Sequence, residues 1–165
     1  MARVYLGLGS NLGNPGKNLI KAVKKLEESV KIFKVSSLYK TEPVGVKEQP
    51  WFLNCVIMGE TGLKPDELFL KIKDIEREIG RTDTRRWGPR VIDIDILFYD
   101  KITYDRNNLK IPHPSLRERA FVLIPLIEID SALVYPGGRL LKEYMADIED
   151  SQVILFEKDW LRRES

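Results

Sequence analysis

The sequence predicts an α+β fold in which an antiparallel sheet is covered by helices. Alternating apolar residues mark extended segments, apolar residues at helical spacing mark two helices, and prolines and glycines separate these segments. Their order along the chain is strand, helix, strand, strand, helix, strand. This is the order of a ferredoxin-like βαββαβ sandwich. The residues after Tyr99 are expected to form a C-terminal extension.

The first half of this order begins with a strand over residues 3–9. Asn14 and Pro15 then supply a cap and a first-turn proline for a helix. The apolar stripe of this helix consists of Leu19, Ile20, Val23 and Leu26. Residues 30–41 and 52–61 are predicted as the second and third strands, because the segment between them contains prolines and glycine.

The second half begins with a helix that Pro65 opens and Gly80 ends. Its apolar residues at helical spacing are Leu68, Phe69, Ile72, Ile75 and Ile79. Residues 90–99 are predicted as the fourth strand. In the C-terminal extension, residues 102–104 are expected to form a short edge strand and residues 140–145 a helix.

Two aspartates interrupt the apolar fourth strand. Alternation places Asp93 and Asp95 on one face. That face also carries Val91, Leu97 and Tyr99, and the opposite face carries Ile92, Ile94, Ile96 and Phe98. At a spacing of roughly 6–7 Å along a strand, two like charges repel by about 1–3 kcal/mol.

A pair of carboxylates on one strand face is typical of a site for a hard divalent cation. Mg²⁺ takes one or two protein carboxylates, and phosphate oxygens and water complete its shell. Asp93 and Asp95 therefore predict a metal site that serves a phosphorylated substrate. The alternative is a solvated strand face on which the two charges are tolerated.

The segment before the two aspartates is basic and aromatic. Its charged residues are Arg81, Asp83, Arg85, Arg86 and Arg90, which give residues 81–90 a net charge of +3. Arginines at this density indicate binding of polyphosphate. Trp87 adds a flat surface for a base or another ring.

Composition narrows the class of protein. The 165 residues are 43% hydrophobic and are predicted to form a single domain over residues 1–165. The net charge of +2 argues against a dedicated nucleic-acid binder. With Cys55 and His113 as the only cysteine and histidine, an internal disulfide and a His/Cys zinc site are excluded. The absence of a membrane-length apolar segment predicts a cytoplasmic protein.

The sole histidine lies between two prolines. His113 follows Pro112 and precedes Pro114, which predicts a stiff, exposed loop. A histidine in such a loop favours a functional role over a place in the packed core.

Residues 86–97 resemble the signature of the 6-hydroxymethyl-7,8-dihydropterin pyrophosphokinase family. The other matching segments follow in the family's order: residues 8–12, 41–43, 49–54, 76–81 and 112–113, and Arg119 with Phe121. The resemblance covers essentially the whole chain. It implies transfer of a pyrophosphoryl group from ATP to a pterin alcohol in folate biosynthesis.

The resemblance also implies site residues. Two Mg²⁺ ions that bridge the ATP phosphates would be held by Asp93 and Asp95. The catalytic residues would be Arg81, Arg90, Asp95 and Arg119. The ATP contacts would be Glu76, Trp87, Arg90, Lys110 and His113. The pterin contacts would be Thr41, Pro43, Val44, Phe52, Asn54, Asp93 and Phe121. From spacing alone, Phe52 and Phe121 would instead be core residues.

Two other functions stay open. An RNA-binding ferredoxin-like module could use the arginines and Trp87 to bind phosphate and stack a base. Asp93 and Asp95 argue against it, and no RNP1 pattern is present. The second alternative is a small-molecule sensor without catalysis. The expected partners are ATP and the pterin, without nucleic acid or membrane, and the expected state is a monomer.

Overall fold

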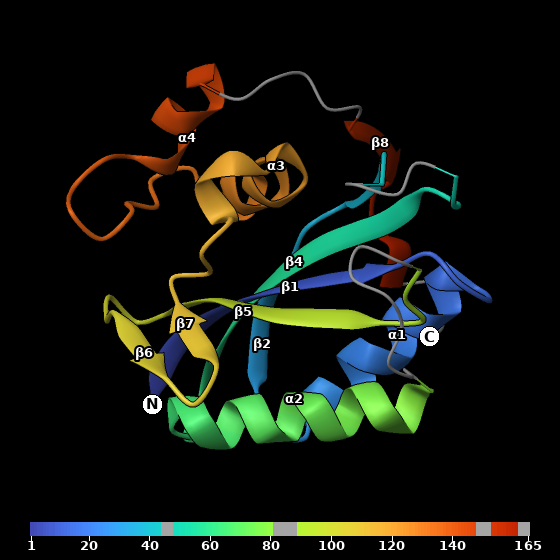
Figure 1. The fold of residues 1–165 in the computed structure, drawn as a ribbon, viewed down its shortest axis with the longest axis horizontal. Coiled ribbons are helices and arrows are strands. Elements are labelled where there is room, and N and C mark those ends of the chain that lie inside the picture. The colour runs from blue at the N-terminus through green and yellow to red at the C-terminus, as the bar shows by residue number, and fades with distance from the viewer. Residues whose placement is uncertain (44–47, 81–88, 148–152, 162–165) are drawn as a thin grey trace.

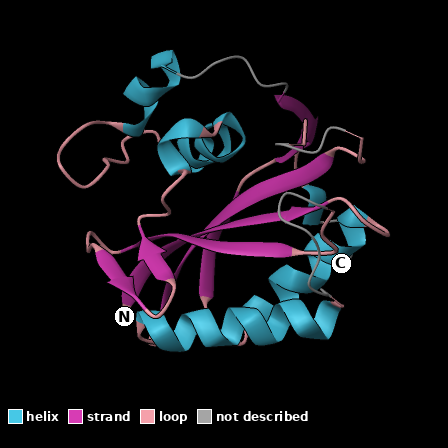
Figure 2. Ribbon diagram, viewed as in Figure 1, coloured by secondary structure: helices cyan, strands magenta, loops and turns pink. Residues whose placement is uncertain are grey.

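The computed structural model describes residues 1–43, 48–80, 89–147 and 153–161. Its main feature is a six-stranded sheet with helices on both faces (Figures 1 and 2). The elements up to the aspartate strand are β1 (Ala2–Ser10), α1 (Pro15–Leu26), β2 (Lys31–Val35), β3 (Leu38–Thr41), β4 (Phe52–Thr61), α2 (Pro65–Ile79) and β5 (Asp93–Tyr99). They are followed by β6 (Tyr104–Arg106), β7 (Leu109–Ile111), a 3₁₀ turn (Leu116–Glu118), α3 (Ala120–Ile129), α4 (Leu141–Tyr144), a second 3₁₀ turn (Met145–Asp147) and β8 (Val153–Glu157).

The sheet has the strand order β5-β1-β4-β3-β8, and β2 also pairs with β4. Every pairing within it is antiparallel. With β2 and β3 taken together as the second strand, this is the order of a ferredoxin-like sandwich, so the predicted fold is confirmed. The strands β6 and β7 form a separate hairpin.

Helices α1 and α2 cover one face of the sheet. Their apolar stripes pack with the sheet in the larger core cluster, which includes Leu19, Leu26, Leu68 and Ile75. The predicted ends are also observed: Asn14 accepts a hydrogen bond from the backbone N–H of Lys17 at 3.2 Å, and Gly80 adopts the left-handed conformation after α2.

The opposite face of the sheet is covered by α3, and α4 packs against α3 (Figure 1). Helix α3 was not predicted, because it is apolar at nearly every position and contains Pro125, which argues against a helix interior. Strand β8 was not predicted either. In the described part of the chain, no helix has the length and apolar character needed to span a bilayer.

The prediction of one strand over residues 30–41 was wrong. Two strands, β2 and β3, occupy this region and are separated by Ser36 and Ser37. The buried Ser36 hydroxyl accepts a hydrogen bond from the backbone N–H of Val56 at 2.9 Å, so a side chain replaces a backbone partner there.

In the fourth strand, the side chains up to Leu97 lie on the faces that alternation predicts. The β1–β5 register shifts between Tyr5 and Leu6, which pair with Phe98 and Ile96. This bulge puts Phe98 with Leu97 in the cluster under α3, whereas Tyr99 packs on the α1–α2 side. The predicted faces of Phe98 and Tyr99 were therefore wrong.

The C-terminal predictions were partly met. The expected edge strand at residues 102–104 begins only at Tyr104, as β6. The helix expected over residues 140–145 is observed as α4, and a 3₁₀ turn follows it.

We expect Ser36→Ala to destabilise the fold by about 1–3 kcal/mol, because it leaves the buried N–H of Val56 without its acceptor. The free energy of unfolding in urea measures this effect. The matched change Ser29→Ala, at a half-buried turn position after α1, should stay within about 0.5 kcal/mol. Equal effects of the two substitutions would contradict the structural role of the Ser36 hydroxyl.

Candidate active site

A pocket of about 270 Å³ lies on the α3 side of the sheet. Nine of the site residues implied by the resemblance line it: Thr41, Phe52, Asn54, Arg90, Asp93, Asp95, His113, Arg119 and Phe121. They come from strands β3, β4 and β5, from the segment just before β5, and from the segment between β7 and the first turn of α3. The structure thus brings together residues that are up to 80 positions apart in the sequence, from 41 to 121.

The floor of the pocket is formed by glycines of β1. Gly9 lies opposite Asn54 of β4 and Asp93 of β5, and Gly7 lies opposite Asp95. A β-carbon at Gly9 would collide with the side-chain oxygen of Asn54. Gly9 therefore leaves room for the Asn54 side chain, whereas a β-carbon at Gly7 would make ordinary contact with Leu97.

Sequence reasoning missed Gly7, Gly9 and Glu42 as pocket residues. The glycines carried a usable signal, because two glycines at alternate positions within a strand indicate close approach to that face of the sheet. Glu42 carried none that distinguishes it from a surface glutamate.

The amide of Asn54 has a fixed orientation. Asn54 and Thr41 are both buried, and the Asn54 Nδ2 group donates a hydrogen bond to the Thr41 hydroxyl. The side-chain oxygen lies over Gly9 at the pocket floor. The Asn54 amide thus presents a polar edge to the pocket.

Two phenylalanines contribute aromatic surface to the pocket. Phe52 lines it without belonging to either core cluster, so core packing does not account for its position. Phe121 both lines the pocket and packs against the cluster under α3. The Arg119 guanidinium lies 5.5 Å from the centre of the Phe121 ring.

The two aspartates have the electrostatic character expected of a cation site. Although 38% of the Asp95 side chain is exposed, partial removal from water raises the pKa of Asp95, and the negative charges of Asp93 and Glu76 raise it further. Arg119 and Lys73 oppose this shift. A cation beside Asp95 would relieve the repulsion.

The donor set fits Mg²⁺, which takes carboxylate oxygens together with phosphate and water. No group of three or more metal-binding side chains occurs among the residues that the structure describes. An ion held by Asp93 and Asp95 would therefore depend on a bound phosphate and on water for its remaining ligands.

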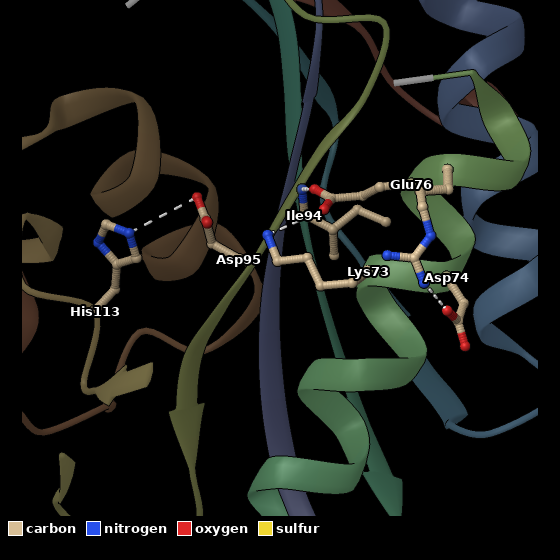
Figure 3. A network of polar contacts seen from close by, with 7 residues as sticks. Lys73, Asp74, Glu76, Ile94, Asp95 and His113 are labelled. Atoms are coloured by element: carbon tan, nitrogen blue, oxygen red, sulfur yellow. Dashed lines mark hydrogen bonds and ion pairs between the residues drawn. The ribbon is translucent and has the colours of Figure 1, made fainter. Parts of the chain in front are cut away.

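His113 points toward Asp95 (Figure 3), and both side chains line the pocket. Its Nδ1 atom accepts a hydrogen bond from the backbone N–H of Ser115 at 3.2 Å, which places the proton of the neutral ring on Nε2. Nε2 lies 3.8 Å from an Asp95 carboxylate oxygen. Burial and the nearby Arg119 lower the pKa of His113 to about 4, so the ring is neutral at pH 7. The loop prediction of an exposed histidine was wrong, because only 23% of the side chain is exposed.

Glu76 lies on the other side of β5 from Asp95 (Figure 3). The carboxylate is 2% exposed, accepts a hydrogen bond from the backbone N–H of Ile94 at 2.9 Å and lies 3.2 Å from the Lys73 ammonium. Glu76 therefore holds the backbone between the two aspartates and does not line the pocket.

The remaining predicted residues lie elsewhere. Lys110 is exposed on β7, with its ammonium 4.0 Å from an Asp105 oxygen, and Pro43 is buried outside the pocket lining. Val44, Arg81 and Trp87 lie outside the described residues.

Comparison with known protein families identifies the relationship. The family model described as 7,8-dihydro-6-hydroxymethylpterin-pyrophosphokinase (HPPK) matches residues 5–131. The chain belongs to this family. The match spans β1 to α3 and so includes the pocket residues of every contributing strand.

Two named pyrophosphokinases are similar to this chain over nearly their whole length. A 2-amino-4-hydroxy-6-hydroxymethyldihydropteridine pyrophosphokinase of Aquifex aeolicus is 47% identical over 145 residues, which cover 87% of this chain and 91% of the relative. The protein of the same name from Methylorubrum extorquens is 43% identical, with 93% of this chain and 98% of the relative covered.

Solved structures support the fold. The crystal structure of wild-type Plasmodium falciparum HPPK-DHPS matches with a TM-score of 0.73 at 16% identity and covers 88% of this chain. The chain spans only 44% of that longer protein. At this identity the likeness concerns the HPPK fold alone.

We expect Gly9→Ala to displace the Asn54 amide, because the added methyl group meets its oxygen, and to break the bond to Thr41. The side-chain amide resonances of Asn54 in NMR spectra should shift, with a loss of stability of about 1–3 kcal/mol. Gly16→Ala is the control, since the nearest atom to its new methyl group is 3.8 Å away. Unchanged Asn54 resonances in Gly9→Ala would refute the proposed contact.

Proposed function

We propose that this chain transfers the pyrophosphoryl group of ATP to the hydroxymethyl group of 6-hydroxymethyl-7,8-dihydropterin and releases AMP, a step of folate biosynthesis. The proposal is based mainly on one observation. A single pocket combines an amide and two aromatic rings with two arginines and two aspartates, in a chain that belongs to the HPPK family.

One half of the pocket suits a pterin. A flat heterocycle with a polar edge requires aromatic faces and a group that both donates and accepts hydrogen bonds. Phe52 and Phe121 supply aromatic surface, and Asn54, oriented by Thr41, supplies the amide. We assign Pro43 and Val44 to the same half from the sequence alone.

The other half suits a polyphosphate. Arg90 and Arg119 line this half, and the planar guanidinium group of arginine matches phosphate oxygens in geometry. The neutral His113 ring presents an N–H group beside them. We assign Arg81, Trp87 and Lys110 to ATP from the sequence alone. Glu76 would act on this half through β5, because its carboxylate bonds the backbone of Ile94.

Asp93 and Asp95 would hold the two Mg²⁺ ions of the proposal, and when bound these ions neutralise phosphate charge and act as Lewis acids. The residues of the chain contribute mainly position. Phe52, Phe121 and Asn54 would orient the pterin so that its hydroxymethyl oxygen approaches the β-phosphorus in line with the bond to AMP. Arg90 and Arg119 would stabilise the charge that develops there.

The RNA-binding alternative is disfavoured by the pocket itself. Asp93 and Asp95 line it and would repel a nucleic-acid backbone that has no accompanying cation.

From the sequence alone, we also propose that the protein is a cytoplasmic monomer with one domain.

Incubation of the protein with ATP, Mg²⁺ and the reduced pterin alcohol tests this function. We expect AMP and the pterin pyrophosphate as products, with no activity once EDTA removes the metal. Formation of ADP would indicate an ordinary kinase. Absence of any turnover, together with binding of the pterin, would favour the sensor.

We expect Asp95→Asn to lower turnover by about a hundredfold or more, because the variant loses a charged metal ligand. The same change should raise the melting temperature of the ligand-free protein, since it removes repulsion with Asp93 and Glu76. Steady-state kinetics and thermal unfolding measure both effects. Asp74→Asn, which alters an exposed partner of Arg77 on α2, should leave turnover within about twofold. Near-normal turnover of Asp95→Asn would remove Asp95 from the metal site.

A further inference from the structure

A buried asparagine joins the two segments that lead into the strands of the pocket. Asn11 directly follows β1 and is 2% exposed. Its Nδ2 group donates hydrogen bonds to the side-chain oxygen of Gln49 and the carbonyl of Pro50, both at 2.9 Å. Its Oδ1 atom accepts from the backbone N–H of Arg90 at 2.8 Å, and its own N–H donates to the Arg90 carbonyl at 3.0 Å.

These contacts lie beyond the ends of the sheet pairings. The β1–β4 pairing ends at Ser10 and Leu53, and the β1–β5 pairing ends at Gly9 and Asp93. Gln49, Pro50 and Arg90 therefore lack the strand register that fixes the residues after them. Asn11 places all three against the end of β1.

The neighbouring polar side chains do not duplicate this connection. Ser10 and Asn18 both donate hydrogen bonds to the carbonyl of Val91. They therefore secure the segment before β5 but bond neither Gln49 nor Pro50. Asn11 contacts both segments.

The chemistry of the position requires an amide. Two carbonyl oxygens must each receive a hydrogen bond and one N–H must find an acceptor, all from one short side chain. An asparagine amide has two donor hydrogens and an acceptor oxygen, whereas an ionised aspartate donates none and a serine donates one. The Asn11 side chain uses both of its donor hydrogens and its acceptor oxygen in these three bonds, and it does not line the pocket.

Both connected segments carry pocket residues. Arg90 itself lines the phosphate half, and Phe52 of the pterin half follows Pro50 by two positions. We propose that Asn11 is a positioning residue that fixes Arg90 relative to Phe52, and with them the phosphate half of the pocket relative to the pterin half. This inference rests on the proposed function, because it assigns the two halves to two substrates.

Loss of this connection should affect turnover more than binding of one substrate. Each half of the pocket retains its own side chains, so the pterin alone still finds Asn54, Phe52 and Phe121. Transfer between two substrates depends on their relative position, and a displacement of about 1 Å lowers rates by about a hundredfold.

The test compares Asn11→Ala with Asn14→Ala. Asn14 caps α1 in the same loop, where its side chain accepts a hydrogen bond from the N–H of Lys17. Loss of that side chain should leave kcat within about twofold. We expect Asn11→Ala to lower kcat by about tenfold or more, with the Kd for the pterin alone changed by less than about threefold. A folded Asn11→Ala protein with kcat within about twofold of wild type would overturn the proposal.

A second variant tests the same connection. If Asn11→Ala does not fold, Gln49→Met at a half-buried position removes one of the connections and should lower kcat by about threefold or more. Unchanged kcat in that variant would overturn the proposal.

Hydrogen exchange of the Asn11 variant separates this proposal from the proposed function. In Asn11→Ala, peptides covering residues 48–53 and 89–92 should both exchange faster, whether or not the wild-type protein forms AMP. Faster exchange in only one of them would show that Asn11 does not join the segments. Failure of the wild-type protein to form AMP would count against the proposed function and leave this measurement standing.

Discussion

The antiparallel pairing of β1 with both β4 and β5 is the constraint on which the rest of the structure depends. The register sets Asn54 and Asp93 on either side of Gly9, and Asp95 beside Gly7. A shift by one residue in either pairing would turn these side chains toward α1 and α2. The apolar residues that alternate with them, such as Leu8, Cys55 and Ile94, lie in the core cluster on that side and hold the register. The burial of one face thus determines the chemistry of the other.

The parts of the fold that could be predicted follow from local rules. Residues 52–61 follow a segment that contains prolines and glycine, and Pro65 marks the first turn of α2. The shared face of Asp93 and Asp95 follows from alternation alone. The parts that were missed depend on contacts distant in sequence. The bulge opposite Tyr5 moved Phe98 to the other face, and helix α3, covered by the sheet and α4, has no amphipathic stripe.

The candidate site shows the same division. The resemblance in sequence indicated Asn54 and the two aspartates without a fold, but it could not reveal that Glu76 lies behind β5 or that Asn11 bonds two segments far apart in sequence. These roles depend on which backbone group lies within reach, which only the folded chain determines. The site also concentrates negative charge: Asp93, Asp95 and Glu76 surround one short stretch of strand. The fold tolerates this arrangement because the large apolar clusters on both sheet faces supply stability elsewhere.

The position of α3 along the chain has a consequence for synthesis. Strands β1 to β5 are complete at Tyr99, but Arg119 and Phe121 of the pocket emerge only afterwards. A nascent chain that leaves the ribosome from its N-terminus can thus assemble the central sheet with its α1–α2 layer while the other face is still bare. Binding competence is acquired late in translation, when that second layer covers the sheet.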